Sequence, residues 1–309
     1  MLRSLFAALV RAVPTLLVTW GLVFALFQLI PGDPVNIMLG GAPASPQVRE
    51  AMRKDLGLDA PAPIRFARFV GHVMTGDLGT SYRTRQRVSA MLADNVPPTL
   101  ALAAGGLIVG VTFGLLFGIA AGLRPGGIAD FACSSIVLGA ASLPNFWSGM
   151  LLIWLFGIIL KWAPILGGGI SALVLPSVAA GLFVVSGFAR LIRSSLIETM
   201  GQDYIRTARA KGLGPSRILW RHAMPNALIP AITLLGMQLA TMIGGAMVTE
   251  NIFARPGLGT LLVQSVLAKD MPVVQAIVVY TTGAYIFINI AVDLVIRLID
   301  PRLRGEQGR

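Results

Sequence analysis

The side chains best suited to bind a charged partner lie in one polar segment, Glu198–Asn226, between two long apolar runs. This segment, called the island below, carries seven charges, five basic and two acidic. Arginine and lysine side chains in such a loop form charge-assisted hydrogen bonds with carboxylates of another protein. Because basic loops of membrane proteins are retained in the cytoplasm, we expect the island to lie there and to offer a docking site for a cytoplasmic partner. The plainer alternative is a solvated loop that only orients the protein.

The rest of the sequence holds no recognisable catalytic constellation. There is no G-x-x-x-x-G-K-[ST] nucleotide-binding loop and no H-E-x-x-H zinc motif. The two histidines, His72 and His222, are too few and too far apart for a histidine metal cluster. The single cysteine, Cys133, excludes a disulfide within the chain. We therefore expect a non-catalytic chain with no cofactor or metal of its own.

A few ionisable residues lie within or beside apolar runs, where such groups are functional candidates. Arg190 and Arg193 lie one turn apart near the inner face, where snorkelling accounts for both. Asp293 and Arg297 are spaced to pair along one helix. Glu250 is close enough to the outer face to be solvated. This set indicates no proton relay.

Composition indicates a protein that crosses the membrane several times. The chain has 309 residues, 55% of them hydrophobic and 13% charged, with a mean hydropathy of +0.76. A soluble domain would carry about 25% charged residues. The net charge of +11 does not indicate nucleic-acid binding, because the basic residues flank apolar runs.

Six charge-free runs can each hold about 20 residues of helix, the length that crosses a bilayer. We interpret the first as a retained helix, since no A-x-A-like cleavage site follows it before Pro31. Six spans place both termini on one side. Basic residues at the N-terminus, at Arg124, in the island and after the sixth run identify that side as cytoplasmic. The runs are Ala12–Gly32, Asn95–Leu123, Phe131–Leu160, Trp162–Ala189, His222–Thr249 and Met271–Val292.

The segment 31–95 is expected outside and has order of its own. Ser45 as N-cap, Pro46 in the first turn and Gly57 at the end predict a short helix. The stretch Ile64–Gly76 predicts a second helix. We interpret the segment as an ordered cap over the spans; docking of an outside partner is the alternative.

The second and third runs carry residues that shape helices. Glycines recur every four residues in the second run, which predicts a face that another helix approaches closely. Pro144 interrupts the third run and predicts a kink. The glycines are Gly106, Gly110, Gly114, Gly118 and Gly122.

The island resembles the cytoplasmic loop of inner-membrane permease subunits of ABC importers. Their general pattern is E-A-A, three residues, Gly, nine residues and I-x-L-P. Arg206-Thr207-Ala208 occupies the first slot, Gly212 the glycine and His222–Pro225 the last, with the Glu and Ile of the pattern replaced. The sequence DYIRTARAKGL at Asp203–Leu213 is closer to the dipeptide/oligopeptide branch, which often has Arg-Asn where this chain has Pro225-Asn226.

Other motifs similar to the first permease of these systems extend the resemblance over nearly the whole chain. They are PGDP at 31–34, LGLD at 56–59, GDLGTS at 76–81, PGLG at 256–259 and DPRLR at 300–304.

The resemblance implies an all-α polytopic fold with six transmembrane helices, that of type I ABC importer permeases. It implies a single domain over 1–309, with 31–95 as an extracytoplasmic insert and 198–230 as a cytoplasmic coupling loop. The implied partners are a second homologous permease, two ATPase subunits that bind ATP and Mg²⁺, and an extracytoplasmic substrate-binding protein. The implied location is the bacterial inner membrane.

The resemblance also implies which residues of the island couple the chain to an ATPase. Gly212 would form the turn, and Ala208 and Ala210 would be small residues where backbones meet. Basic side chains would add ion pairs. The full set is Asp203, Tyr204, Arg206, Thr207, Ala208, Arg209, Ala210, Lys211, Gly212, Pro225 and Asn226.

The motifs do not identify the transported solute. Dipeptides, longer peptides, glutathione, nickel chelates and other small solutes all use similar permeases. A self-sufficient carrier or channel and an intramembrane enzyme are the competing classes of function.

Overall fold

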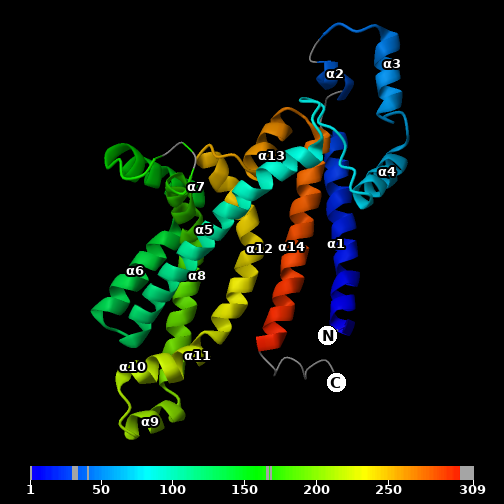
Figure 1. Cartoon of the computed structure of the whole chain (residues 1–309). Coiled ribbons are helices and arrows are strands. Elements are labelled where there is room, and N and C mark those ends of the chain that lie inside the picture. Colours follow the sequence, from blue (N-terminus) through cyan, green and yellow to red (C-terminus); the bar gives the residue numbers. More distant parts are fainter. Residues whose placement is uncertain (1, 30–33, 40–41, 165–166, 168, 300–309) are drawn as a thin grey trace. The chain divides into compact units, whose positions relative to one another are not determined.

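The computed structural model describes residues 2–29, 34–39, 42–164, 167 and 169–299. Over this part the chain is helical, and its β-structure is limited to an isolated bridge between Thr80 and Arg87. The all-α prediction is therefore confirmed. The helices are α1 (Leu2–Leu29), α2 (Pro34–Leu39), α3 (Pro46–Asp55), α4 (Ala62–Met74), α5 (Val88–Leu123), α6 (Ile128–Ser142), α7 (Asn145–Leu152), α8 (Ser171–Met200), α9 (Asp203–Ala210), α10 (Pro215–Ile218), α11 (Met224–Ala227), α12 (Ile229–Ile252), α13 (Leu258–Leu267) and α14 (Met271–Ile299) (Figure 1). Two π-helical segments, Ile153–Ile159 and Leu219–Ala223, follow α7 and α10.

Four of the described helices, α5, α8, α12 and α14, are long and apolar enough to cross a membrane. A bent helix pair, Ile128–Ser142 with Asn145–Ile159, passes the same test as one broken span. The apolar part of α1 described here, Ala12–Leu26, is shorter. A polytopic membrane protein is thus confirmed, while the count of six spans stays a prediction.

The third run is not one kinked helix. The axes on either side of its break differ by 108°. Leu143 is extended, with ψ 130°, and Pro144 caps α7. A proline lacks the N–H that would continue the helix, and it drives the residue before it out of the helical region. The prediction of a kink at Pro144 found the position but not the size of the bend.

Two further helices have different limits from the charge-free runs. Helix α5 begins at Val88, seven residues before Asn95. Helix α8 begins at Ser171 and continues past Ala189 to Met200. A helix can continue through charged residues near the membrane surface, because their side chains reach into water. A charge-free run therefore marks the apolar part of a span and not the ends of its helix.

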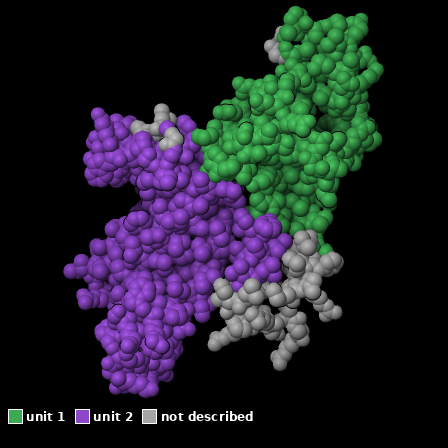
Figure 2. Space-filling model, in the orientation of Figure 1, with its two compact units in different colours: residues 1–99, 256–286 green, residues 100–255, 287–309 purple. Residues whose placement is uncertain are grey.

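The chain divides into two compact units, which Figure 2 colours separately. One comprises residues 1–99 and 256–286, the other residues 100–255 and 287–309. Helices α5 and α14 have a part in each unit.

In the unit of residues 100–255 and 287–309, α8 is the central helix and the most buried of the long ones. It packs against α6, α7 and α12. On another face it meets the glycines of α5 at a repeat of four residues. A Cβ added to Gly114 would lie 2.5 Å from the Phe188 Cβ, and one added to Gly118 would lie 2.7 Å from the Ile192 Cβ. In the same register Gly106 faces Ala180, Gly110 faces Val184 and Gly122 faces Leu196.

In the unit of residues 1–99 and 256–286, α4 packs on α1 through aromatic rings. The Phe24 and Phe66 ring centroids lie 5.4 Å apart, and Trp20 meets Phe69 edge to face at 6.4 Å. The predicted N-cap of α3 is confirmed, since the Ser45 hydroxyl accepts a hydrogen bond from the Val48 N–H. Gly57 has φ +62°, which favours glycine just past a helix end.

The loop before α5 is tied to the start of α14 by one carboxylate. Asp270, 2% exposed, accepts hydrogen bonds from the Ser81 hydroxyl and from the Tyr82 N–H, the latter at 3.0 Å. The Leu258 N–H donates to the Thr99 hydroxyl at 2.8 Å, which joins the start of α13 to α5. These buried contacts give the segment an ordered core.

Candidate functional site

The island folds as a compact helical knob at the end of α8 (Figure 1). Helix α9 begins at Asp203 and ends at Ala210. Gly212 then turns the chain with φ +75°, a conformation that costs other residues about 1–2 kcal/mol, and its N–H donates to the Arg209 carbonyl at 2.9 Å. Helix α10 starts three residues later with Pro215 in its first turn.

A small apolar core holds the knob together. Ile205 and Ala208, spaced i, i+3 on α9, are 0% and 7% exposed. They pack with residues of α10, the π-helical segment and α11, and with Leu196 near the end of α8. Ala208 thus lies inside the knob, and the expectation that it forms part of an outer contact is corrected. Ala210, the other small residue of α9, lies on the surface.

The outer surface of the knob is basic. Arg209 and Lys211 are exposed and belong to no ion pair of the described chain, and Arg206 pairs with Asp203 only at 3.4 Å on the open surface. Such exposed pairs contribute little to stability and are easily exchanged for an external partner. The other exposed residues of the predicted set are Tyr204, Thr207, Gly212, Pro225 and Asn226.

A hydrogen bond between two predicted residues closes the knob. The Asn226 amide donates to the Tyr204 hydroxyl at 2.9 Å and to the His222 carbonyl at 3.2 Å. This joins the start of α9 to α11, 22 residues later. Both residues were expected in the loop, but their pairing could not be read from sequence spacing.

The C-terminal half of α8 is also fixed by an ion pair that could not be read from sequence spacing. Arg193 donates from Nε and Nη2 to the two carboxylate oxygens of Asp130, at 2.6 and 2.7 Å. Asp130 lies in the first turn of α6, is 5% exposed, and also accepts from the Gly126 N–H and the Ser134 hydroxyl. Arg193 is therefore held by a carboxylate, and the snorkelling interpretation is corrected for it. The only sequence signal was a lone acidic residue beside a long apolar run.

The remaining ionisable candidates lie in different surroundings. Arg190 is exposed and donates to the Ser186 carbonyl of its own helix at 3.2 Å. Glu250 on α12 is 1% exposed, so the expectation that it is solvated is wrong. The predicted pair of Asp293 with Arg297 is not tested, because the Arg297 side chain lies outside the described residues.

We expect the Asp130–Arg193 pair to stabilise the fold as a unit. Asp130→Asn and Arg193→Gln should each lower the apparent Tm of the detergent-extracted protein, because each leaves the other group without its partner. The double variant should lose less than the sum of the two, since the energies of contacting partners are not additive. Additive losses would contradict the pairing. Asp203→Asn, on the open surface, serves as the control and should leave Tm unchanged.

Comparison with protein families places nearly the whole chain in one group. Residues 114–305 match the sequence model described as the inner membrane component of binding-protein-dependent transport systems. Residues 1–103 match the model for the N-terminal part of the membrane component of the same systems.

Curated relatives match along almost their full length. A di/tripeptide transport system permease protein of Pseudomonas aeruginosa is 35% identical, with 96% of each chain covered. A glutathione transport system permease protein of Salmonella paratyphi A is 39% identical, covering 98% of this chain and 99% of the relative. A putative peptide transport system permease protein of Brucella abortus is 37% identical over 96% of this chain and 97% of its own.

Among solved structures, an inward-facing form of a methionine ABC transporter is similar in fold. Its TM-score is 0.57 at 22% identity, and the match covers 68% of this chain and 96% of that one. At this identity the likeness shows the fold alone.

Proposed function

The chain belongs to the family of inner membrane components of binding-protein-dependent transport systems, and we propose that it forms half of a translocation path that the island couples to ATPase subunits. It is a transmembrane permease subunit of an ABC importer. The path would be completed by a second, homologous permease. ATP hydrolysis, with its Mg²⁺, would belong to two partner subunits, and an extracytoplasmic binding protein would deliver the solute.

The observation that carries the proposal is the construction of the island. Its basic face is exposed, and its apolar core includes Leu196 of α8. A partner with acidic groups can therefore bind the exposed basic face of the island. The apolar core beneath that face is packed against the end of α8. A displacement of the knob would move α8 as a rigid body, which is how packed helices transmit closure.

Three features carry that motion into the membrane part of the same unit. Helix α8 packs closely against the glycines of α5, it packs against α12, and Arg193 links it to α6. Closely packed interfaces resist deformation, so the group would shift together. A loop that served only to orient the protein would need neither the internal core nor the Tyr204–Asn226 bond.

The solute class follows from the relatives. Their names specify di/tripeptides, glutathione and peptides. Short peptides and peptide-like solutes are therefore the proposed cargo. Nickel chelates or another small solute carried by the same machinery remain the alternative, because the selecting partner is a separate protein.

We further assign residues 1–309 to one transmembrane domain in the bacterial inner membrane, with both termini and the 198–230 coupling loop in the cytoplasm. Residues 31–95 would form the extracytoplasmic insert. ATP is available only on the cytoplasmic side, so coupling requires this orientation of the island.

Cysteine labelling of intact cells tests the orientation. In a Cys133→Ala background, Gln47→Cys on the exposed start of α3 should react with a membrane-impermeant maleimide added outside, and Ser216→Cys on α10 should not. After the cells are opened, both should react. Labelling of Ser216→Cys in intact cells would contradict coupling through the island.

A further inference from the structure

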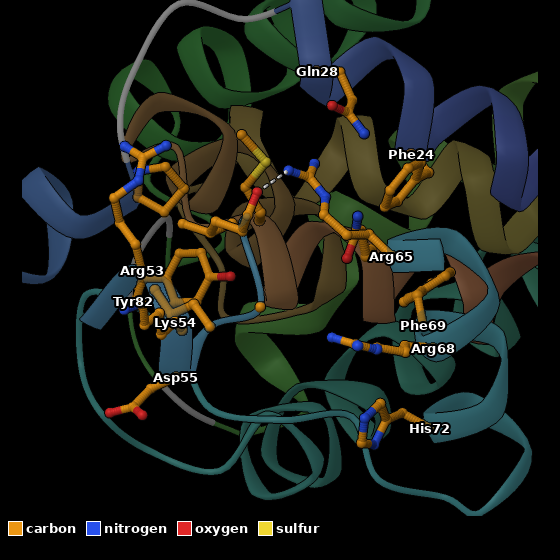
Figure 3. A pocket seen from close by; sticks show the side chains of 16 residues that line it. Phe24, Gln28, Arg53, Lys54, Asp55, Arg65, Arg68, Phe69, His72 and Tyr82 are labelled. Atoms are coloured by element: carbon orange, nitrogen blue, oxygen red, sulfur yellow. Dashed lines mark hydrogen bonds between the residues drawn. The ribbon is translucent and has the colours of Figure 1, made fainter. Parts of the chain in front are cut away.

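A cavity of about 630 Å³ lies in the unit of residues 1–99 and 256–286 (Figure 3). Its walls come from the end of α1, the end of α3, the inner face of α4, Tyr82 and the first turns of α14. Small-molecule sites span about 300–1,000 Å³, so a headgroup-sized ligand fits. Neither the island nor α8 contributes to the cavity.

The lining is basic. Arg53, Lys54, Arg65, Arg68 and His72 line the cavity, against one acidic residue, Asp55. Three of the basic side chains have carboxylate neighbours: Arg53 with Asp59 at 3.7 Å, Lys54 with Glu50 at 3.3 Å and His72 with Asp77 at 3.4 Å. Within the described part of the chain, Arg65 and Arg68 have none.

These two arginines lie one turn apart on α4, so their charges share one face of the helix and repel each other. The Arg65 Nη1 donates only a long hydrogen bond, 3.4 Å, to the Leu58 carbonyl. Its guanidinium carbon lies 5.7 Å from the centre of the Phe24 ring. Two cations held beside a cavity with their donors available are stabilised by an anion between them.

Gly57 makes room for one of these groups. It has φ +62°, and a Cβ added there would come within 2.9 Å of the Arg68 Nη1. In Figure 3 the Arg68 side chain extends from α4 into the cavity. The glycine thus permits both the turn after α3 and the approach of the guanidinium.

Neutral donors complete the lining. Burial raises the pKa of Tyr82, as does nearby Asp270, so its hydroxyl stays protonated and can donate. In Figure 3 that hydroxyl points into the cavity. Gln28 and Gln275 also line the cavity. Phosphate and carboxylate groups accept two parallel hydrogen bonds from an arginine guanidinium. A neutral hydroxyl such as that of Tyr82 is a further donor to the same oxygens.

The position of the cavity along α1 distinguishes among oxyanions. The apolar part of α1 runs from Ala12 to Leu26, and Phe24 and Gln28 at its end line the cavity. The end of an apolar helix lies near the level of the lipid headgroups, and long basic side chains near helix ends reach that level. Phe69 adds a second apolar surface.

We propose that this cavity binds the phosphodiester of an anionic phospholipid headgroup, held by Arg65 and Arg68. Free phosphate shares the chemistry but would not use the location at the end of an apolar helix. The proposal needs only that the chain is embedded in a membrane. It is independent of the proposal that the island couples the chain to an ATPase.

The test uses the full-length chain, extracted with whatever subunits co-purify, stripped of lipid and titrated with phosphatidylglycerol in mixed micelles. Thermal stabilisation reports binding. We expect Arg65→Gln and Arg68→Gln to weaken the apparent affinity about tenfold each, the effect of losing one charge-assisted contact. Arg83→Gln, an exposed arginine in the same segment that does not line the cavity, is the matched control and should bind as the unaltered protein does.

Three results would overturn the proposal. If Arg68→Gln and the unaltered protein bind phosphatidylglycerol with equal affinity, the lipid does not bind at this cavity. Equal binding of phosphatidylcholine would show that anionic charge is not recognised. Equal binding of inorganic phosphate or glycerol phosphate would assign the cavity to a soluble anion. Arg68→Lys keeps the charge but not the fork, so it should weaken binding less than Arg68→Gln and guards against a folding defect.

Discussion

Gly114→Leu should remove most of the assembled permease from the membrane. The glycine faces Phe188 on α8, and an added Cβ alone would lie 2.5 Å from the Phe188 Cβ and 3.3 Å from the Val185 carbonyl oxygen. Neither neighbour is the free end of a flexible chain, so α5 and α8 would have to separate. Overpacking of this kind costs about 1–3 kcal/mol, and separation of two membrane helices also loses their close contact.

The measurement is the amount of monodisperse complex recovered by affinity purification and gel filtration. We expect about a tenfold loss for Gly114→Leu, equivalent to about 1.4 kcal/mol. Gly139→Leu on α6 is the matched control, because a Cβ there meets nothing within 4 Å. Full recovery of Gly114→Leu with normal transport would show that the glycine face does not hold these helices together.

Gly212→Asp should uncouple the complex without preventing insertion. The residue has φ +75°, and a Cβ there meets nothing within 4 Å, so the change acts through backbone strain and through charge. Aspartate would place a negative group among Arg209, Lys211 and the acidic residues expected on the ATPase. Loss of a charge-assisted contact costs about 1.5–3 kcal/mol, so we expect transport and solute-stimulated ATP hydrolysis to fall about tenfold or more.

Two variants separate strain from charge. Gly212→Asn has the same size and the same backbone demand without the charge. Gly214→Asp adds the charge at an exposed position with φ −64°, where no left-handed backbone is required. If the added charge causes most of the loss, transport should fall less in Gly212→Asn than in Gly212→Asp or Gly214→Asp. Unchanged transport and ATP hydrolysis in Gly212→Asp would leave the island as a loop that only orients the chain.

Local features of the fold were predictable because they depend on neighbours in sequence. The cap at Ser45 and the turn at Gly212 each follow from one residue's preference for a backbone conformation. The burial of Ala208 was also predictable, because Ala208 follows Ile205 by three residues and therefore shares its helix face. The resemblance to the family pattern implied instead that the small Ala208 side chain lies at an outer contact.

Long-range features were not predictable from one sequence. Asp130 and Arg193 are 63 residues apart, and only the packing of α6 on α8 brings them together. The burial of Glu250 likewise depends on the helices around α12 and not on its nearness to the end of a run. Pro144 predicted where the helix breaks, but not the 108° between the two helix axes.

We expect this chain to transport solute only as part of an ATP-driven complex. The most direct test is uptake of a labelled dipeptide into proteoliposomes, with the chain reconstituted either alone or with its co-purified subunits and the binding protein. We expect no uptake by the chain alone, and uptake by the complex that requires ATP on the side of the island. Uptake by the chain alone, or uptake by the complex that is equally fast without ATP, would show that the chain does not depend on ATPase partners.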